Sequence, residues 1–197
     1  MFTGLWPFQH GADWRAPLDR RAPVLSEVLA ARGYRTGGFV ANLVYASSEH
    51  GLDRGFQVYR DYRRSPGAIL RSASLAERAL TATFFRHRTG FYDIVGRKSA
   101  PDVNKEFLAW QRQSPDRPWF AFLNYYDAHE PYLPRPPFAG RYSAGLPTRR
   151  LGELRFWSVE GGIGDWSRLT PDEASAEQAA YEEVITSLDA EVGRLLQ

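Results

Sequence analysis

The chain has 197 residues, of which 43% are hydrophobic and 24% are charged, and this profile is typical of a globular protein with a real core. The formal net charge is only +2, which argues against a surface dedicated to nucleic acid. Cysteine is absent, so the chain contains no disulfide, thiolate metal site or cysteine nucleophile.

No apolar run approaches the roughly 18 residues that a membrane-spanning helix needs. The first residues lack the basic and apolar segments of a signal peptide. We therefore expect no nucleic-acid partner and no membrane segment, and a cytoplasmic location if Met1 is the natural start. The oligomeric state stays open.

Apolar residues at helical spacing predict a helix over residues 23–33, and Gly33 fits the left-handed residue that ends it. The next segment, YRTGGFVA (34–41), predicts a strand in which Gly37 and Gly38 indicate a twist or a close backbone approach. Helix followed by strand is the first sign of an alternating α/β pattern.

Residues 51–62 predict a loop that leads into a short aromatic segment, and residues 67–90 predict partial helix. Residues 101–113 predict a helix with one apolar stripe, formed by Val103, Phe107 and Trp110. Residues 118–126 are almost continuously apolar, which predicts a strand inside a parallel sheet covered on both faces.

Residues 134–170 are rich in Gly, Pro, Arg and Trp and predict a long irregular excursion. Thr170 and Glu173 then form a capping box with proline at the first helical position. Apolar residues keep helical spacing from Tyr181 to Leu196, so we expect one helix that continues to the last residues.

These elements predict an α/β fold: a layered sandwich with a mostly parallel central sheet flanked by helices. Ligands of such sheets bind beyond the carboxyl ends of the strands. Asp127, His129 and Glu130 follow the strand at 118–126 directly, so they are candidates for a ligand site. The alternative is a loop with solvated acids and a structural histidine.

Five stretches, in this order along the chain, carry a family resemblance. WFAFLNYYDAHEPYLPRPPF (119–138) is an aromatic strand followed by D-x-H-x-P-Y. The others are FTGLWPFQHGA (2–12), VLSEVLAARGYRTGGFVAN (24–42), HGLDRGFQVYRDY (50–62) and YEEVITSLDAEVGRLL (181–196). Together they resemble the central part of the catalytic domain of the sulfatase family, within the alkaline phosphatase superfamily.

The resemblance implies an incomplete, alkaline-phosphatase-like catalytic domain over residues 1–197 and metal-dependent hydrolysis of a small-molecule or glycan sulfate ester. The family uses a formylglycine or serine nucleophile on a divalent cation, usually Ca²⁺, which stabilises charge on the ester oxygens. The matching segments exclude both the nucleophile and the metal ligands. We therefore expect the nucleophile upstream of Met1 and no metal ligand or catalytic nucleophile within the chain.

Residue by residue, the resemblance assigns sulfate contact to His129. Asp127 is expected to fix the loop or to orient that histidine, and Tyr132 with Pro131 to shape the turn. Many sulfatases have G-K-W-H after the first matched strand, whereas this chain has F-V-A-N. Asn42 takes roughly the place of that histidine and could donate a hydrogen bond to the substrate anion.

The other histidines have simpler interpretations: His10 caps a turn, and His50 and His87 are surface residues without partners. Two further functions stay open. The missing nucleophile and metal ligands are compatible with a non-catalytic α/β remnant or binding module. The departure at F-V-A-N leaves the substrate class open, so the other alternative is a relative of phosphodiesterases or phosphonate hydrolases.

Overall fold

The computed structural model describes most of the chain, namely residues 2–13, 16–62, 97–146 and 169–197 and the single positions Phe84, Arg88 and Asp93. Two compact units divide it. The sheet unit comprises Met1–Arg64 and Gly96–Tyr126, and the second unit comprises Ser65–Val95 and Asp127–Gln197.

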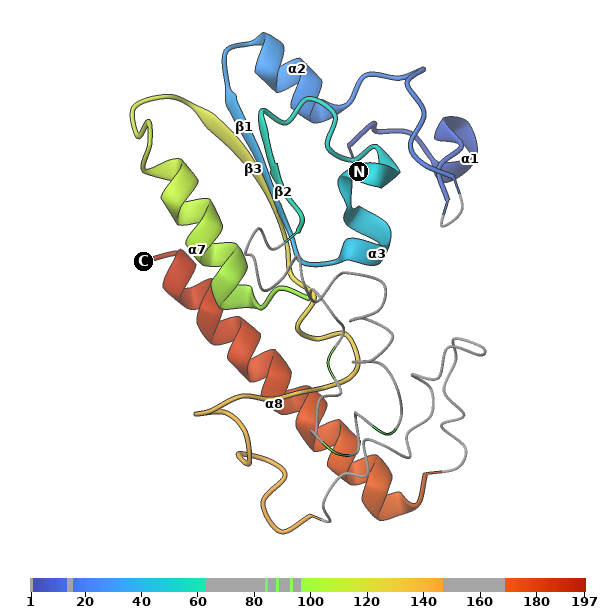
Figure 1. Cartoon of the computed structure of the whole chain (residues 1–197), viewed down its shortest axis with the longest axis vertical. Helices are drawn as coiled ribbons and strands as arrows, with labels where there is room; N and C mark the ends of the chain where they lie inside the picture. The colour runs from blue at the N-terminus through green and yellow to red at the C-terminus, as the bar shows by residue number, and fades with distance from the viewer. Residues whose placement is uncertain are drawn as a thin grey trace. The chain divides into compact units, whose positions relative to one another are not determined.

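The sheet unit is built on three parallel strands in the order β2-β1-β3 (Figure 1). They are β1 (Arg35–Val40), β2 (Val58–Arg60) and β3 (Trp119–Asn124). Parallel neighbours need crossover connections, and α7 (Ala100–Gln111) lies in the crossover between β2 and β3. The predicted α/β class is thereby confirmed.

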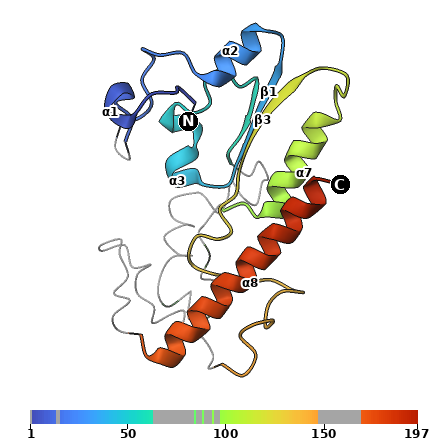
Figure 2. The same ribbon diagram turned by 180° about the vertical axis from the view of Figure 1, so that it is seen from behind.

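The remaining helical segments of the sheet unit are short: α1 (Pro7–His10), α2 (Leu25–Ala31), α3 (Leu43–Ala46) and the 3₁₀ turn η1 (Ser48–His50). Two opposite views show α7 on one side of the strands and α2 with α3 on the other (Figures 1 and 2). The helix predicted over 23–33 is α2, and Gly33 beyond it has the expected left-handed φ of 86°.

One face of β1 packs directly on α7. The Phe39 ring lies 5.8 Å from the Phe107 ring and 5.6 Å from the Trp110 ring. A Cβ atom on Gly37 would lie 3.1 Å from the Trp110 ring, so glycine is what lets this indole reach the strand. The predicted apolar stripe of the helix is confirmed, because Val103, Phe107 and Trp110 are buried.

The other face of β1 is covered by a second set of aromatic rings. A Cβ atom on Gly38 would lie only 2.3 Å from Cδ2 of Tyr59. Phe2 packs edge-on against Phe122 of β3 with ring centres 4.9 Å apart. All six residues of β1 are buried, and the close approach predicted at both glycines is confirmed.

Strand β3 differs from its prediction. Residues 118–126 were expected to lie inside the sheet, covered on both faces, but β3 is mostly half-buried and Trp119 is 42% exposed. The reason is its position, because among the described strands β3 pairs only with β1. Its aromatic side chains cover the sheet edge instead of filling its centre.

Arg54 joins three segments of the sheet unit. Its guanidinium donates to both carboxylate oxygens of Glu27, at 3.0 and 2.9 Å, and to the backbone carbonyls of Asp19 and Ala22, at 2.5 and 3.0 Å. The neighbouring Gly55 has φ +72°, and a Cβ atom there would lie 2.2 Å from the backbone nitrogen of Glu27. This contact fixes how closely the loop approaches α2.

The second unit is organised by α8 (Pro171–Leu195), which begins at the predicted capping box: Glu173 N donates to Thr170 Oγ1 and Thr170 N donates to Glu173 Oε2. The apolar stripe predicted for this helix is only partly buried, because Tyr181 and Ile185 are each 40% exposed. Glu183 is fully buried instead.

Glu183 is buried because it holds the turns before α8 in the chain. Its Oε1 accepts hydrogen bonds from Tyr142 N and Ser143 N, both at 2.9 Å, and from Ser143 Oγ at 2.8 Å. Burial raises the pKa of Glu183, but these hydrogen bonds outweigh it and place the pKa below its ordinary value. The carboxylate is thus a fixed anion in the fold.

Two predictions fall largely outside the described residues. Of the range 67–90, only Phe84 and Arg88 are described, and both are helical. Of the predicted excursion over 134–170, residues 134–146 form turns without helix or strand, and residues 147–168 lie outside the description. In the described parts of the chain, no helix combines the length and apolar character needed to cross a bilayer.

We expect Gly55→Ala to lower the free energy of unfolding by about 3 kcal/mol, because a side chain at left-handed φ costs about 1–2 kcal/mol and overpacking costs a similar amount. Gly33→Ala is the matched control, since it has φ +86° but no atom within 4 Å of the added Cβ. Its cost should stay at about 1–2 kcal/mol. Urea unfolding compares the two, and equal losses would contradict the contact with α2.

Replacing Glu183 by glutamine should destabilise the protein by about 1–3 kcal/mol at neutral pH, because charge-assisted hydrogen bonds are lost. A lowered folded-state pKa means that this stabilisation is complete above the unfolded value near 4.5 and is lost as the pH falls through the folded value. The gap between wild type and Glu183→Gln should therefore close in acid. Glu182→Gln, at an exposed neighbour, controls for the charge, and a pH-independent gap would refute the role of the anion.

Candidate functional site

The carboxyl ends of the three strands meet at one edge of the sheet unit, which is where the fold class predicts a ligand site. Beyond the end of β1, the chain stays joined to Asn124, the last residue of β3: Ala41 N donates to Asn124 O and Asn42 N donates to the Asn124 side chain, both at 3.0 Å. This edge therefore has a defined geometry, and Asn42 lies on it.

Asn42 has a structural role. Its Oδ1 accepts hydrogen bonds from Val44 N and Tyr45 N, both at 3.1 Å, so the residue is the N-cap of α3. The amide nitrogen is the group left to meet an anion. The predicted contact with substrate thus stays a prediction, and the capping bond fixes the side-chain orientation from which it would be made.

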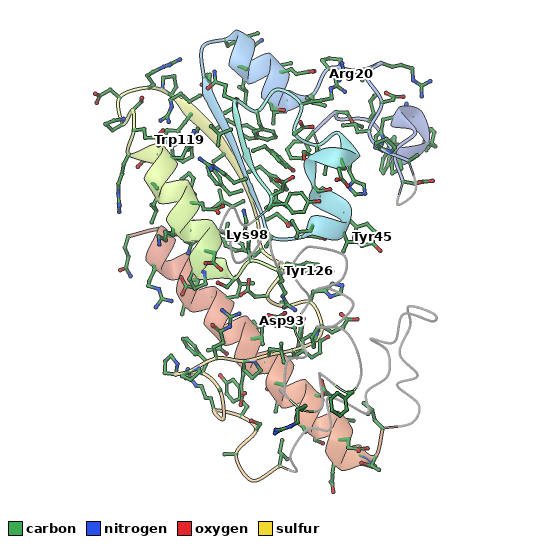
Figure 3. The ribbon with its side chains drawn as sticks, in the orientation of Figure 1. Arg20, Tyr45, Asp93, Lys98, Trp119 and Tyr126 are labelled. Atoms are coloured by element: carbon green, nitrogen blue, oxygen red, sulfur yellow. The ribbon has the colours of Figure 1, made fainter. Side chains whose placement is uncertain are left out.

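Lys98 reaches the same edge from a distant part of the sequence (Figure 3). Its Nζ donates to the carbonyl of Arg60, the last residue of β2, at 2.6 Å and to Glu106 Oε2 at 2.8 Å. Burial lowers the pKa of Lys98, and Glu106 partly offsets that effect. The lysine is fully buried, so we assign it to fastening β2 onto α7 and not to a ligand.

Asp61 follows β2 at this edge. Its Oδ2 accepts from Ser48 N at 2.9 Å and from Ser48 Oγ at 2.8 Å, and its Oδ1 accepts from Tyr62 N at 2.8 Å. Burial raises the pKa of Asp61, but the hydrogen bonds from Ser48 and Tyr62 prevail and hold it below the ordinary value. Sequence reasoning missed Lys98 because it lies in no motif. It missed the role of Asp61, which lies in the stretch 50–62, because its partner Ser48 lies 13 residues earlier in the chain.

The described residues do not fit the Ca²⁺ that the family resemblance implies. Within the described ranges, no three carboxylate or imidazole side chains cluster as a metal would require. The buried carboxylates Asp61 and Glu183 are already engaged by backbone donors. We therefore derive no chemical step through a metal.

The D-x-H-x-P-Y segment lies in the second unit. His129 Nδ1 is 2.8 Å from the carbonyl of Glu130 and 3.4 Å from its Oε2, and the imidazole is 40% exposed. Pro131 is buried, and the Tyr132 ring packs on Tyr181 of α8 with ring centres 5.0 Å apart. Tyr132 thus connects this segment to α8, and the roles predicted for His129 and Asp127 stay predictions.

The bond at Nδ1 determines what His129 can offer. A carbonyl oxygen only accepts, so Nδ1 carries the proton in the neutral ring and Nε2 carries a lone pair. The ring then offers an acceptor at Nε2, and it donates from Nε2 only after protonation. Neutral His129 suits a general base, whereas protonated His129 suits contact with an anion.

The other histidines are placed as follows. Ala12 N donates to His10 Nδ1 at 3.1 Å, which confirms that His10 caps a turn. The prediction for His50 was wrong: it is partly buried, and its Nδ1 lies 3.0 Å from the buried Ser47 Oγ. No sequence pattern indicates that partner, because the 3₁₀ turn is too short to show one. His87 lies outside the described residues.

No protein-family model matches the sequence, and no curated protein matches it significantly. Among solved structures, the phosphonate monoester hydrolase of Agrobacterium radiobacter is similar, with a TM-score of 0.62 and 21% sequence identity. The match covers 98% of this chain and 47% of that enzyme, so the chain spans about half of its length. The chain thus has an α/β fold of the alkaline-phosphatase type, matched over part of the domain.

Proposed function

We propose that the protein is a hydrolase of esters of a tetrahedral oxyanion, with sulfate esters as the first candidate and phosphonate monoesters as the second. The observation that carries the proposal is the match of 98% of the chain to a phosphonate monoester hydrolase. The motif resemblance favours sulfate, and the structural neighbour favours phosphonate.

The two candidate substrates make the same demand on a binding site. A sulfate monoester and a phosphonate monoester each present a tetrahedral centre with one negative charge spread over terminal oxygens. Such a group needs hydrogen-bond donors and positive charge around it, more so in the transition state. Donors that serve one ester would therefore serve the other.

We assign the binding of that anion to His129. Protonated His129 supplies a charge-assisted hydrogen bond from Nε2, while Nδ1 stays fixed on the Glu130 carbonyl. Asn42, in the sheet unit, is a separate candidate for contact with an anion, through an amide that capping has already oriented. Asp127 and Tyr132 support the loop that carries the histidine.

His129→Ala should weaken binding of inorganic sulfate and of methylphosphonate by about 10–100-fold, the range of one charge-assisted hydrogen bond. NMR titration of the chain with each anion measures the loss. Lys105→Ala removes an exposed cation and should leave anion binding unchanged. An equal loss of affinity in this control would mean that overall charge, and not a bond from His129, causes the effect.

Turnover separates the candidate functions. The protein expressed from its complete gene is assayed with 4-nitrophenyl sulfate and with 4-nitrophenyl phenylphosphonate. The first candidate predicts a higher kcat/KM for the sulfate, the second predicts the reverse, and His129→Ala should lower either value by about 100-fold. Anion binding without hydrolysis of either ester would support the alternative of a non-catalytic binding module.

A further inference from the structure

A pocket of about 410 Å³ opens in the sheet unit. Its walls come from the first eighteen residues and from the segment between Tyr45 and Leu52, and Phe122 of β3 also lines it. This volume lies within the range of small-molecule sites, which are mostly apolar with a few convergent polar groups. The lining follows that description.

The apolar lining is suited to a flat ring. Phe2 and Phe122 pack edge to face, and Leu18 and Leu52 add aliphatic walls. Aromatic rings favour edge-to-face and offset contacts with one another, so a ligand ring would extend the existing pair. Tyr45 projects from α3 beside the same space (Figure 3).

Two imidazoles supply the polar side of the pocket. Ala12 N donates to His10 Nδ1, so the neutral ring carries its proton on Nε2. His50 Nδ1 is held by Ser47 Oγ, which leaves Nε2 as the nitrogen that can meet a ligand. His10 thus offers a donor at Nε2 to a ligand in the pocket, and His50 offers a donor or an acceptor at Nε2 according to its tautomer.

The one carboxylate among the described lining residues is already engaged. Asp13 accepts a hydrogen bond from Ala16 N at 2.8 Å through Oδ1, within a short turn. The walls are tied together by backbone as well, because Leu18 N donates to the carbonyl of His50 at 3.0 Å. The described lining thus offers an aromatic wall and imidazole donors in a fixed frame.

We infer that this pocket binds an aromatic ring that carries an oxygen acceptor, of the carboxylate or phenolate class. The aromatic wall recognises the ring, and the imidazoles of His10 and His50 recognise the oxygen.

The test uses the whole chain and benzoate as the probe, followed through the imidazole NMR signals. Benzoate should shift the signals of His10 and His50 saturably, with a Kd on the order of millimolar for so small a ligand. Acetate lacks the ring and should give no saturable shift. Toluene lacks the acceptor and should bind at least about tenfold more weakly than benzoate.

Ala16→Phe fills the pocket and should abolish the benzoate shifts, whereas Ala31→Phe makes the same change on the exposed end of α2 and should preserve them. If Ala16→Phe fails to fold, His50→Phe keeps a ring but removes the donor. It should weaken benzoate by about tenfold and leave toluene unchanged.

Shifts that are absent from His10 and His50, or unchanged in Ala16→Phe, would overturn the inference. The outcome is separable from the proposed function. Benzoate binding without ester turnover counts against the hydrolase and leaves the pocket standing. Turnover without benzoate binding overturns the pocket alone.

Discussion

The sheet unit depends on two positions of β1, one on each face of the strand, that carry no side chain. Gly37 admits the Trp110 indole on one side, and Gly38 admits the Tyr59 ring on the other. Since β1 lies between β2 and β3, these two contacts set the distance of α7 and the position of the neighbouring strand. The edge at which the strands end, where Asn42 and Lys98 lie, inherits its geometry from them.

Much of the fold could be predicted because its signals are local. The helix α2, the strand β1, the stripe on α7 and the capping box of α8 each depend on residues close together in the sequence. The burial of Glu183 could not be predicted, because its donors lie some 40 residues earlier in the chain. The exposure of β3 depends on which strands flank it, and periodicity does not report that.

The candidate site was predictable in its residue types more than in their bonds. The motif resemblance selects His129 and Asn42, but it does not show that the Glu130 carbonyl fixes the protonated nitrogen of His129 or that Asn42 caps α3. Those bonds decide which atom can meet an anion. Lys98 and Asp61 bond to Arg60 and Ser48, which lie 38 and 13 residues away, so sequence patterns do not indicate these contacts. The partner of His50 is close in sequence, but the 3₁₀ turn that joins them is too short to show a pattern.

Arg54 has a consequence for recognition. Its guanidinium donates to the carbonyls of Asp19 and Ala22 and to the carboxylate of Glu27. Asp19 directly follows Leu18, which lines the pocket. The pocket wall at Leu18 is thus pre-organised by bonds that involve no ligand. Binding of a ligand therefore costs little conformational entropy in this loop. Selectivity at such a rigid pocket would come from the shape of the ligand and not from closure of the loop around it.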